Sequence, residues 1–304
     1  MLRAVRLLTA SALFLFFIAA VLNPSADAQS TLTGEWTASV RGEASEDADK
    51  IQLNFERRTE RGHRNQMGQS YAYTDLQGLT REQAMRGGAV RFSLVREAGT
   101  IECEGSFQNG RGSGTFRFTG NASFVSAMKS RGFDFEKGKH GHDTEERLFA
   151  AATLNVTTAL ADDLLSADFG RLDVDDLFKA AIFKVDSKFM REMKASGFPN
   201  LGMEELVKAR IFKIDADFVK EVVALGFEGE TFESLVKMRI FKVTPQFIAE
   251  ARNEGLSNLS IEELVKLRIF NIDADFIRRA KADGTPLEVE ELVQRRIGVP
   301  RRRN

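Results

Sequence analysis

Two histidines of this chain lie close enough in the sequence to share a metal ion. His140 and His142 are separated by one residue, and Asp143 and Glu145 follow them. This spacing suits a strand or an extended loop, and a zinc ion would need at least one further ligand, which requires the loop to fold back. The third histidine, His63, lies in a different part of the chain. Because lysine and glycine surround the pair, we favour a solvated loop and predict no metal and no other cofactor.

The other reactive side chains match no catalytic motif. The sequence contains no P-loop, no dinucleotide-binding glycine motif and no spacing typical of a catalytic triad. The one cysteine, Cys103, has no partner for an internal disulfide and alternates with Ile101 and Phe107 on one face of a predicted strand. A buried thiol in that position is inert. We therefore predict that the protein is not an enzyme.

Basic side chains recur at an interval of 29 residues through the C-terminal half. They form three columns: Arg210, Arg239 and Arg268; Lys184, Lys213 and Lys242; and Lys179, Lys208, Lys237 and Lys266. One interpretation is a solvated face laced with ion pairs, which contribute little stability. The other is a ridge that binds an anionic partner, such as a peptide, a cell-envelope polymer or an acidic protein face. On this second hypothesis, reversing the charges of the three arginines together abolishes partner binding and leaves the melting curve unchanged.

The apolar residues follow the same interval. The segment Ile182–Asp186 returns in copies that begin at Ile211, Ile240 and Ile269. A second phenylalanine keeps the same step, and a glycine follows it by eight residues in every copy. Such a period is typical of small stacked units rather than of one globular core. Stacked units usually bind partners and seldom catalyse reactions.

Each copy predicts a pair of short helices. In one copy, a helix begins at Glu204 and ends near Phe212, Asp215 stands at the N-cap of a second helix, and Gly226 ends that helix. Extending the pattern in both directions predicts one leading helix, five helical hairpins and one closing helix. Helices of about 10 residues are unstable alone in water. We therefore expect the Ile and Phe side chains of successive copies to bury one another in a continuous spine.

The amino-acid sequence of these copies resembles that of a known kind of repeat. The segments Glu205–Phe212 and Phe218–Glu221 are similar to short α-repeats of bacterial exported proteins, including the extramembrane repeats appended to BlaR1-like metallopeptidases. The peptidase part is absent, because the chain has no His-Glu-x-x-His motif. The residue after each repeat Ile, often His in those proteins, is Phe here, so no metal or pH role of that residue is implied. The resemblance implies a sensing or protein-contact role and no defined activity.

The N-terminus has the composition of a secretory signal. Arg3 and Arg6 precede an uncharged apolar run over Leu7–Leu22, and small residues at Ala26 and Ala28 predict cleavage before Gln29. The alternative is an uncleaved membrane anchor, but the run is shorter than the ~20 residues that span a bilayer comfortably. We predict an exported protein, periplasmic or secreted, with no transmembrane segment after cleavage.

The apolar residues of the next segment, 29–120, have a period of two. Ile51, Leu53 and Phe55 share a face and polar residues separate them, while Asn109-Gly110 is a strong hairpin signal. This pattern predicts an antiparallel meander or half-barrel of five or six strands, with its apolar face covered by the first helices.

The stretch Thr59–Gly88 interrupts this alternation. It is rich in Gly, Gln and Arg, which favours a loop. Within it we predict one strand near Ser70–Tyr73 and a short helical turn near Thr80–Met85, where Thr80 and Gln83 have capping-box spacing.

Charge and composition exclude some partners. The formal net charge is −1, so no overall field attracts nucleic acid or a membrane. The chain has 25 Phe against 2 Tyr and 1 Trp, which indicates core filling rather than a stacking surface for bases. We therefore predict a protein or peptide partner, anionic if the basic columns bind it, and no nucleic acid.

Together these patterns predict an α+β multidomain chain in which a small β-domain precedes an α-solenoid. The predicted segments are a signal peptide (1–28), an antiparallel β-domain (29–120), a first helix with an insertion loop (121–143), helical repeats of 29 residues (144–297) and a basic tail (298–304).

The predicted function is a non-enzymatic exported scaffold or sensor that binds a protein through its helical repeats. The basic columns supply the candidate binding residues. The alternative is a small-ligand binder whose pocket lies on the apolar face of the β-domain, around Trp36, Phe55, Phe92 and Phe118.

Overall fold

The computed structural model describes residues 31–40, 48–58, 64–137, 143–167 and 170–298. The predicted signal peptide, the three histidines and the arginine-rich tail lie outside the described residues. The predictions made for these segments remain predictions.

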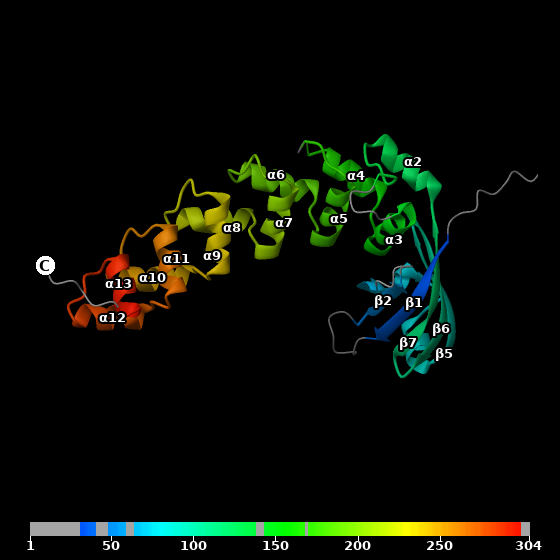
Figure 1. The fold of residues 1–304 in the computed structure, drawn as a ribbon, viewed down its shortest axis with the longest axis horizontal. Coiled ribbons are helices and arrows are strands. Elements are labelled where there is room, and N and C mark those ends of the chain that lie inside the picture. The colour runs from blue at the N-terminus through cyan, green and yellow to red at the C-terminus, as the bar shows by residue number, and fades with distance from the viewer. Residues whose placement is uncertain (1–30, 41–47, 59–63, 138–142, 168–169, 299–304) are drawn as a thin grey trace, which may run out of the picture.

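The N-terminal part of the described chain is one antiparallel sheet of seven strands that curves into a half-barrel (Figure 1). The strands are β1 (Thr31–Val40), β2 (Lys50–Arg58), β3 (Arg64–Ala72), β4 (Leu76–Gln77), β5 (Gly88–Arg96), β6 (Gly99–Gln108) and β7 (Arg111–Gly120). Their order in the sheet is β3-β2-β1-β7-β6-β5-β4. Because β1 pairs with β7, the first and last strands meet in the middle of the sheet, and β3 and β4 form its edges.

The alternation of apolar and polar residues sets the two faces of the sheet. Trp36, Phe55, Phe92 and Phe118 all point to the concave side and are at most 2% exposed. The predicted hairpin is confirmed at Asn109-Gly110, where both residues have positive φ between β6 and β7.

The prediction of five or six strands is wrong, because the described residues form seven. Within Thr59–Gly88, the strand predicted near Ser70–Tyr73 is confirmed as the end of β3, which is longer than predicted and pairs with β2 from Arg64 to Ala72. This edge strand is mostly polar, so its backbone pairing leaves no apolar alternation in the sequence. The predicted helical turn is confirmed as α1 (Arg81–Arg86), which begins with a Thr80–Gln83 capping box.

The first long helix of the chain covers the concave face of the sheet. This helix, α3 (Thr144–Leu154), contacts β1, β3, β6 and β7. Its Phe149 ring stacks on Phe116 at 5.1 Å between centroids and meets Phe55 and Phe118 edge-on. The hydroxyl of Tyr71 donates to the Thr153 carbonyl at 3.0 Å, and burial raises the pKa of this phenol. The sheet and the helices therefore share one core.

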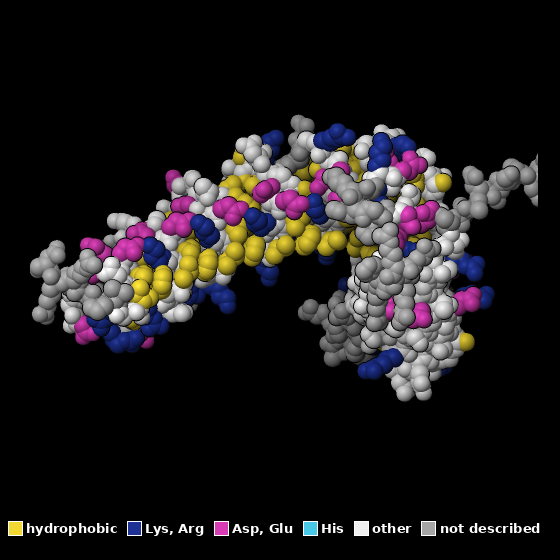
Figure 2. Space-filling model, in the orientation of Figure 1, with side chains coloured by type: hydrophobic (Ala, Val, Ile, Leu, Met, Phe, Trp, Pro, Cys, Tyr) yellow, Lys and Arg dark blue, Asp and Glu magenta, His cyan; other side chains and the backbone are white. Residues whose placement is uncertain are grey.

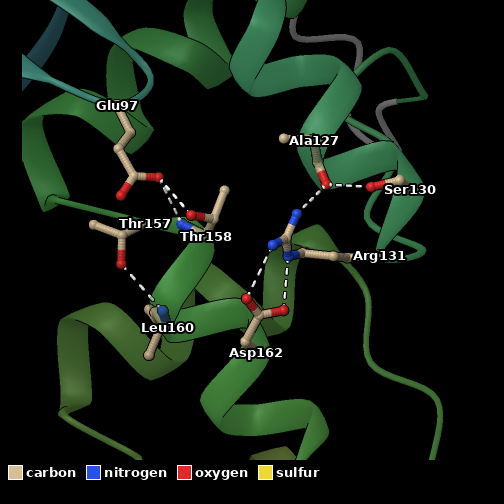
Figure 3. A network of polar contacts seen from close by, with 8 residues as sticks. All are labelled: Glu97, Ala127, Ser130, Arg131, Thr157, Thr158, Leu160 and Asp162. Atoms are coloured by element: carbon tan, nitrogen blue, oxygen red, sulfur yellow. Dashed lines mark hydrogen bonds and ion pairs between the residues drawn. The ribbon is translucent and has the colours of Figure 1, made fainter.

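A polar network holds the next helices against the same end of the sheet (Figure 3). Glu97, in the turn between β5 and β6, accepts from the backbone nitrogen and hydroxyl of Thr158 at 2.8 and 2.9 Å. Arg131 forms a two-point ion pair with Asp162 at 2.7 and 3.0 Å and also donates to the Ala127 carbonyl. The hydrogen bonds from Arg131 lower the pKa of Asp162. The network ties α2 (Ala122–Ser130) and α4 (Thr158–Leu165) to the β-domain.

The rest of the described chain is an arched row of short helices that leads away from the sheet (Figure 1). In the described residues α2 leads, five hairpins follow and α13 (Val289–Arg296) closes the row, as the sequence predicts. The hairpins are α3 with α4, α5 (Val174–Phe183) with α6 (Ser187–Ala195), α7 (Met203–Phe212) with α8 (Ala216–Ala224), α9 (Phe232–Ile240) with α10 (Pro245–Asn253), and α11 (Ile261–Ile269) with α12 (Ala274–Ala282). The first helices of the hairpins (α3, α5, α7, α9 and α11) and α13 contact one another in succession.

The predicted caps of the second helices are confirmed. The N-cap side chain accepts from the backbone nitrogen three residues later at Asp186, Asp215, Thr244 and Asp273, with distances of 2.8, 2.9, 3.2 and 2.8 Å. These helices end next to glycines with positive φ at Gly197, Gly226, Gly255 and Gly284. Each repeat therefore begins and ends its second helix through its own local residues.

The first helix of each repeat ends in a different way. In α7, Lys213 adopts the left-handed conformation, and the backbone nitrogen of Ile214 donates to the Ala209 carbonyl at 2.8 Å. This is a Schellman turn, which folds the apolar residue after the lysine back onto the helix. The same bond recurs at Val185, Val243 and Ile272, and all four of these side chains are at most 4% exposed.

The prediction that the repeat isoleucines are buried in the spine is wrong. Ile211 is 53% exposed, and the following Phe212 is only partly buried. The spine consists instead of Leu206, Ala209 and Ile214, together with their equivalents in the other repeats. Ile211 lies two residues after Ala209, which is about 200° around an α-helix, so it leaves the buried face.

Replacing Phe149 with alanine tests the shared core. Phe149 is 7% exposed and contacts three phenylalanines of the sheet, so Phe149→Ala is expected to lower the free energy of unfolding by about 3–5 kcal/mol. Denaturant unfolding followed by circular dichroism measures the change. Leu165→Ala, at a side chain that is 43% exposed on the neighbouring α4, is the control. A loss below about 1 kcal/mol for Phe149→Ala would contradict this packing.

Candidate partner-binding surface

The first helices present one continuous face to solvent. Figure 2 shows an unbroken band of hydrophobic side chains along the helical region, with acidic and basic side chains along its upper border. In α7 the face begins with Glu204 in the first turn, continues through Lys208 and Ile211, and ends with Lys213 just after the helix. Repetition of α7 along the stack turns these four positions into rows.

The first row is a ladder of ion pairs, which we call the lysine–glutamate ladder. Each pair joins a lysine in one first helix to a glutamate at the start of the next. The pairs are Lys179–Glu204 at 2.5 Å, Lys208–Glu233 at 2.7 Å, Lys237–Glu262 at 2.6 Å, and Lys266–Glu290. The hydrogen bond to Glu204 raises the pKa of Lys179, and the bond to Glu233 raises that of Lys208. Because its charges are paired, the ladder gives the face little net charge.

The second row is apolar and exposed. This isoleucine row consists of Ile182, Ile211, Ile240 and Ile269, which are 52, 53, 47 and 50% exposed. The partly buried Phe183, Phe212, Phe241 and Phe270 follow them and widen the band. Single exposed apolar residues are ordinary on protein surfaces, whereas contiguous apolar patches mark contact sites. Because the isoleucine row repeats at the same position in four hairpins, it is a contiguous apolar patch.

The third row is basic. This lysine row consists of Lys184, Lys213 and Lys242, all exposed and all with φ between 54° and 56°. Within the described residues their ammonium groups form no hydrogen bond or ion pair, unlike the lysines of the ladder. The first and last of the five hairpins have Asn155 and Asn271 at this position, both with positive φ. The lysine row therefore places free positive charge beside the isoleucine row.

The structure gives the three predicted arginines an internal contact. The guanidinium carbons of Arg210, Arg239 and Arg268 lie 3.8, 3.6 and 4.7 Å from the ring centroids of Phe189, Phe218 and Phe247 in the preceding repeat. Arg239 also donates to the Lys213 carbonyl at 2.8 Å, and Arg268 to the Phe241 carbonyl at 3.1 Å. Stacking of this kind stabilises by about 0.5–2 kcal/mol. The arginines thus join neighbouring repeats, and their binding to a partner stays a prediction.

The alternative pocket residues of the β-domain lie in its core. Trp36, Phe55, Phe92 and Phe118 fill the concave side of the sheet, with the Trp36 ring 5.2 Å from Phe92 between centroids. The Trp36 indole nitrogen donates to the Glu104 carbonyl at 3.2 Å. A hollow of about 620 Å³ on the sheet has a mixed polar and apolar lining that includes the charged Glu35, Arg91, Glu102 and Arg117. Ligand binding by the four aromatic residues stays a prediction that would need this packing to open.

Other kinds of site find little support in the described part of the chain. No group of three or more His, Cys, Asp or Glu side chains there is placed to hold a metal ion. No single described helix is long and apolar enough to cross a membrane; α3 and α4 meet the length and composition criteria only together, with an 84° bend between them.

Comparison with known proteins assigns the chain to no family. No protein-family model, curated protein sequence or solved structure matches the chain. The resemblance to the repeats of exported bacterial proteins therefore stays a prediction.

Two features of this surface are missing from the sequence interpretation, although the sequence contains signals for both. The ladder pairs are 25 residues apart in three cases and 24 in the fourth, which is one repeat less one helical turn. The exposure of the isoleucines follows from the helical phase set by Leu206 and Ala209. If the Ile-Phe pair is treated as one apolar unit, the orientation of the isoleucine away from the buried face of the helix is missed.

Replacing Arg239 tests whether the arginines join the repeats. Arg239→Gln removes the contact with Phe218 and the charged donor to Lys213, so we expect the free energy of unfolding to fall by about 1–2 kcal/mol. Lys242→Gln, which removes an exposed charge without a described partner, should change it by less than about 0.5 kcal/mol. Equal effects of the two substitutions in chemical denaturation would rule out the proposed role of Arg239. Reversing all three arginine charges would likewise alter the melting curve.

Proposed function

We propose that the protein is a non-enzymatic scaffold or sensor that binds a partner protein along the exposed face of its first helices. The isoleucine row carries this proposal. Four isoleucines in successive repeats leave about half of their surface in water, while the leucines of the same helices are at most 1% exposed. These helices thus bury one set of apolar side chains, the leucines, and expose a second set, the isoleucines. A contact surface accounts for that second set.

The architecture supports the same proposal. Helical repeats that contact mainly their neighbours form an extended surface with little concave volume for a reaction. The β-domain anchors one end of the row through the Phe149 cluster and the Glu97 and Arg131 network. An exported location belongs to the proposal through the signal-like segment 1–28, and secretion would present this surface to an envelope or extracellular partner.

Photo-cross-linking in the producing cells tests the scaffold function. A photoreactive phenylalanine derivative at Ile211 or at Ile240 is expected to give a discrete adduct with one protein, because both positions lie in the isoleucine row. The same derivative at Thr37, on the outward face of β1, reports random collisions. Mass spectrometry identifies the adduct. If no position in any of the repeats forms a specific protein adduct, the scaffold proposal fails.

A further inference from the structure

The isoleucine row has a spacing that limits what can lie on it. Its members occupy the same position near the C-terminus of α5, α7, α9 and α11, and these helices contact one another in succession. Packed helices lie about 8–10 Å apart. Successive isoleucines therefore repeat at about that distance, with one apolar side chain per step.

A polyproline II segment matches this step. It has three residues per turn and rises about 3.1 Å per residue, so every third side chain lies on the same face, about 9.3 Å apart. A β-strand repeats a face after two residues, or about 6.7 Å, and does not keep register with the row. An α-helix repeats approximately after seven residues, or about 10.5 Å, and presents a wider apolar stripe. The isoleucine row is bounded by charged rows, which favours the narrower segment.

The charges beside the isoleucine row determine which charge a segment bound to the row should carry. On one side the lysine–glutamate ladder is internally paired. On the other side, the end of α7 has the free Lys213 and the guanidinium of Arg239, which is bound to the Lys213 carbonyl. The carboxylate of Asp215, at the N-cap of α8, and the partial negative charge of the α7 C-terminus, about −0.5, together offset only part of these two positive charges. The open border of the row is therefore positive and complements an acidic segment.

The members of the lysine row occupy positions whose backbone conformation favours other residue types. A left-handed backbone conformation favours Gly or Asn, and Asn155 and Asn271 take that place in the first and last of the five hairpins. Lys184, Lys213 and Lys242 take it in the three hairpins between them. Positive charge beside the apolar row is thus present in three consecutive repeats despite the cost of the backbone conformation.

Building on the proposed scaffold function, we infer that the isoleucine row binds an acidic segment of a partner protein in polyproline II conformation. An apolar side chain at every third position of this segment contacts one isoleucine of the row. Acidic side chains between them face the lysine row. The three steps between successive isoleucines from Ile182 to Ile269 cover about 28 Å. A bound segment in polyproline II conformation needs about ten residues to span this length.

The direct test is binding of a designed peptide to the purified protein. The probe is a fluorescein-labelled peptide of about twelve residues, Leu-Glu-Pro repeated, which favours the polyproline II conformation. We expect saturable binding by fluorescence anisotropy. Ile211→Gln combined with Ile240→Gln should weaken it about tenfold, because both side chains lose their apolar contact. The matched control is Val223→Gln, which changes a side chain that is 41% exposed on α8 and should leave binding unchanged.

A second pair of substitutions tests the charge. Lys213→Asn combined with Lys242→Asn keeps the left-handed backbone acceptable, as Asn271 shows, and removes two cations. We expect weaker binding at low salt and a smaller dependence of the affinity on salt than for the unaltered protein. Leu-Lys-Pro repeats should not bind.

Several outcomes would overturn the inference. These are no saturable binding of the acidic peptide, equal binding of a peptide with the same composition and irregularly placed leucines, and binding that the isoleucine substitutions leave unchanged. Binding of anionic lipid vesicles through the row, without peptide binding, would assign the face to a membrane instead. If cross-linking in cells gives an adduct from Ile211 while the purified protein does not bind the acidic peptide, the scaffold function stands and this inference fails.

Discussion

The stacking of each repeat on the one before it is the interaction on which the helical region depends. Its helices have eight to eleven residues, too few to be stable alone in water. Each repeat contributes a leucine and a small or aliphatic residue to the spine, and α7, α9 and α11 each add an arginine that lies over a phenylalanine of the preceding repeat. These contacts have the same geometry in successive repeats. The arch in Figure 1 is the result of repeating one interface.

That interface also explains which apolar residues stay outside. Once Leu206 and Ala209 fix the buried side of α7, the Schellman turn at Lys213 brings Ile214 inside and leaves Ile211 in water. The exposed row in Figure 2 is therefore set by helix phase and recurs wherever the repeat recurs. Exposing four isoleucines gives up burial energy that a monomeric scaffold could otherwise use. A partner that covers the row, as proposed above, would recover this energy.

Local signals made much of the fold predictable from the sequence. The caps at Asp215 and Gly226, the turn at Asn109-Gly110 and the number of hairpins follow from backbone rules that depend on few neighbours. Only the end of strand β3 near Ser70 could be predicted in this way, because an edge strand needs only backbone pairing and has few apolar residues. The role of the arginines also depends on a ring 21 residues earlier in the chain, so repetition alone could not separate a binding column from a packing column.

The position and continuity of the isoleucine row can be measured directly. Cys103 is fully buried and burial raises its pKa, so introduced cysteines can carry spin labels without interference from it. Labels at Ile182 paired with labels at Ile240 or at Ile269 give distances by pulsed electron paramagnetic resonance. We predict mobile, exposed labels whose separation grows by about 8–10 Å per repeat. Immobilised labels, or distances that do not increase along the chain, would contradict it.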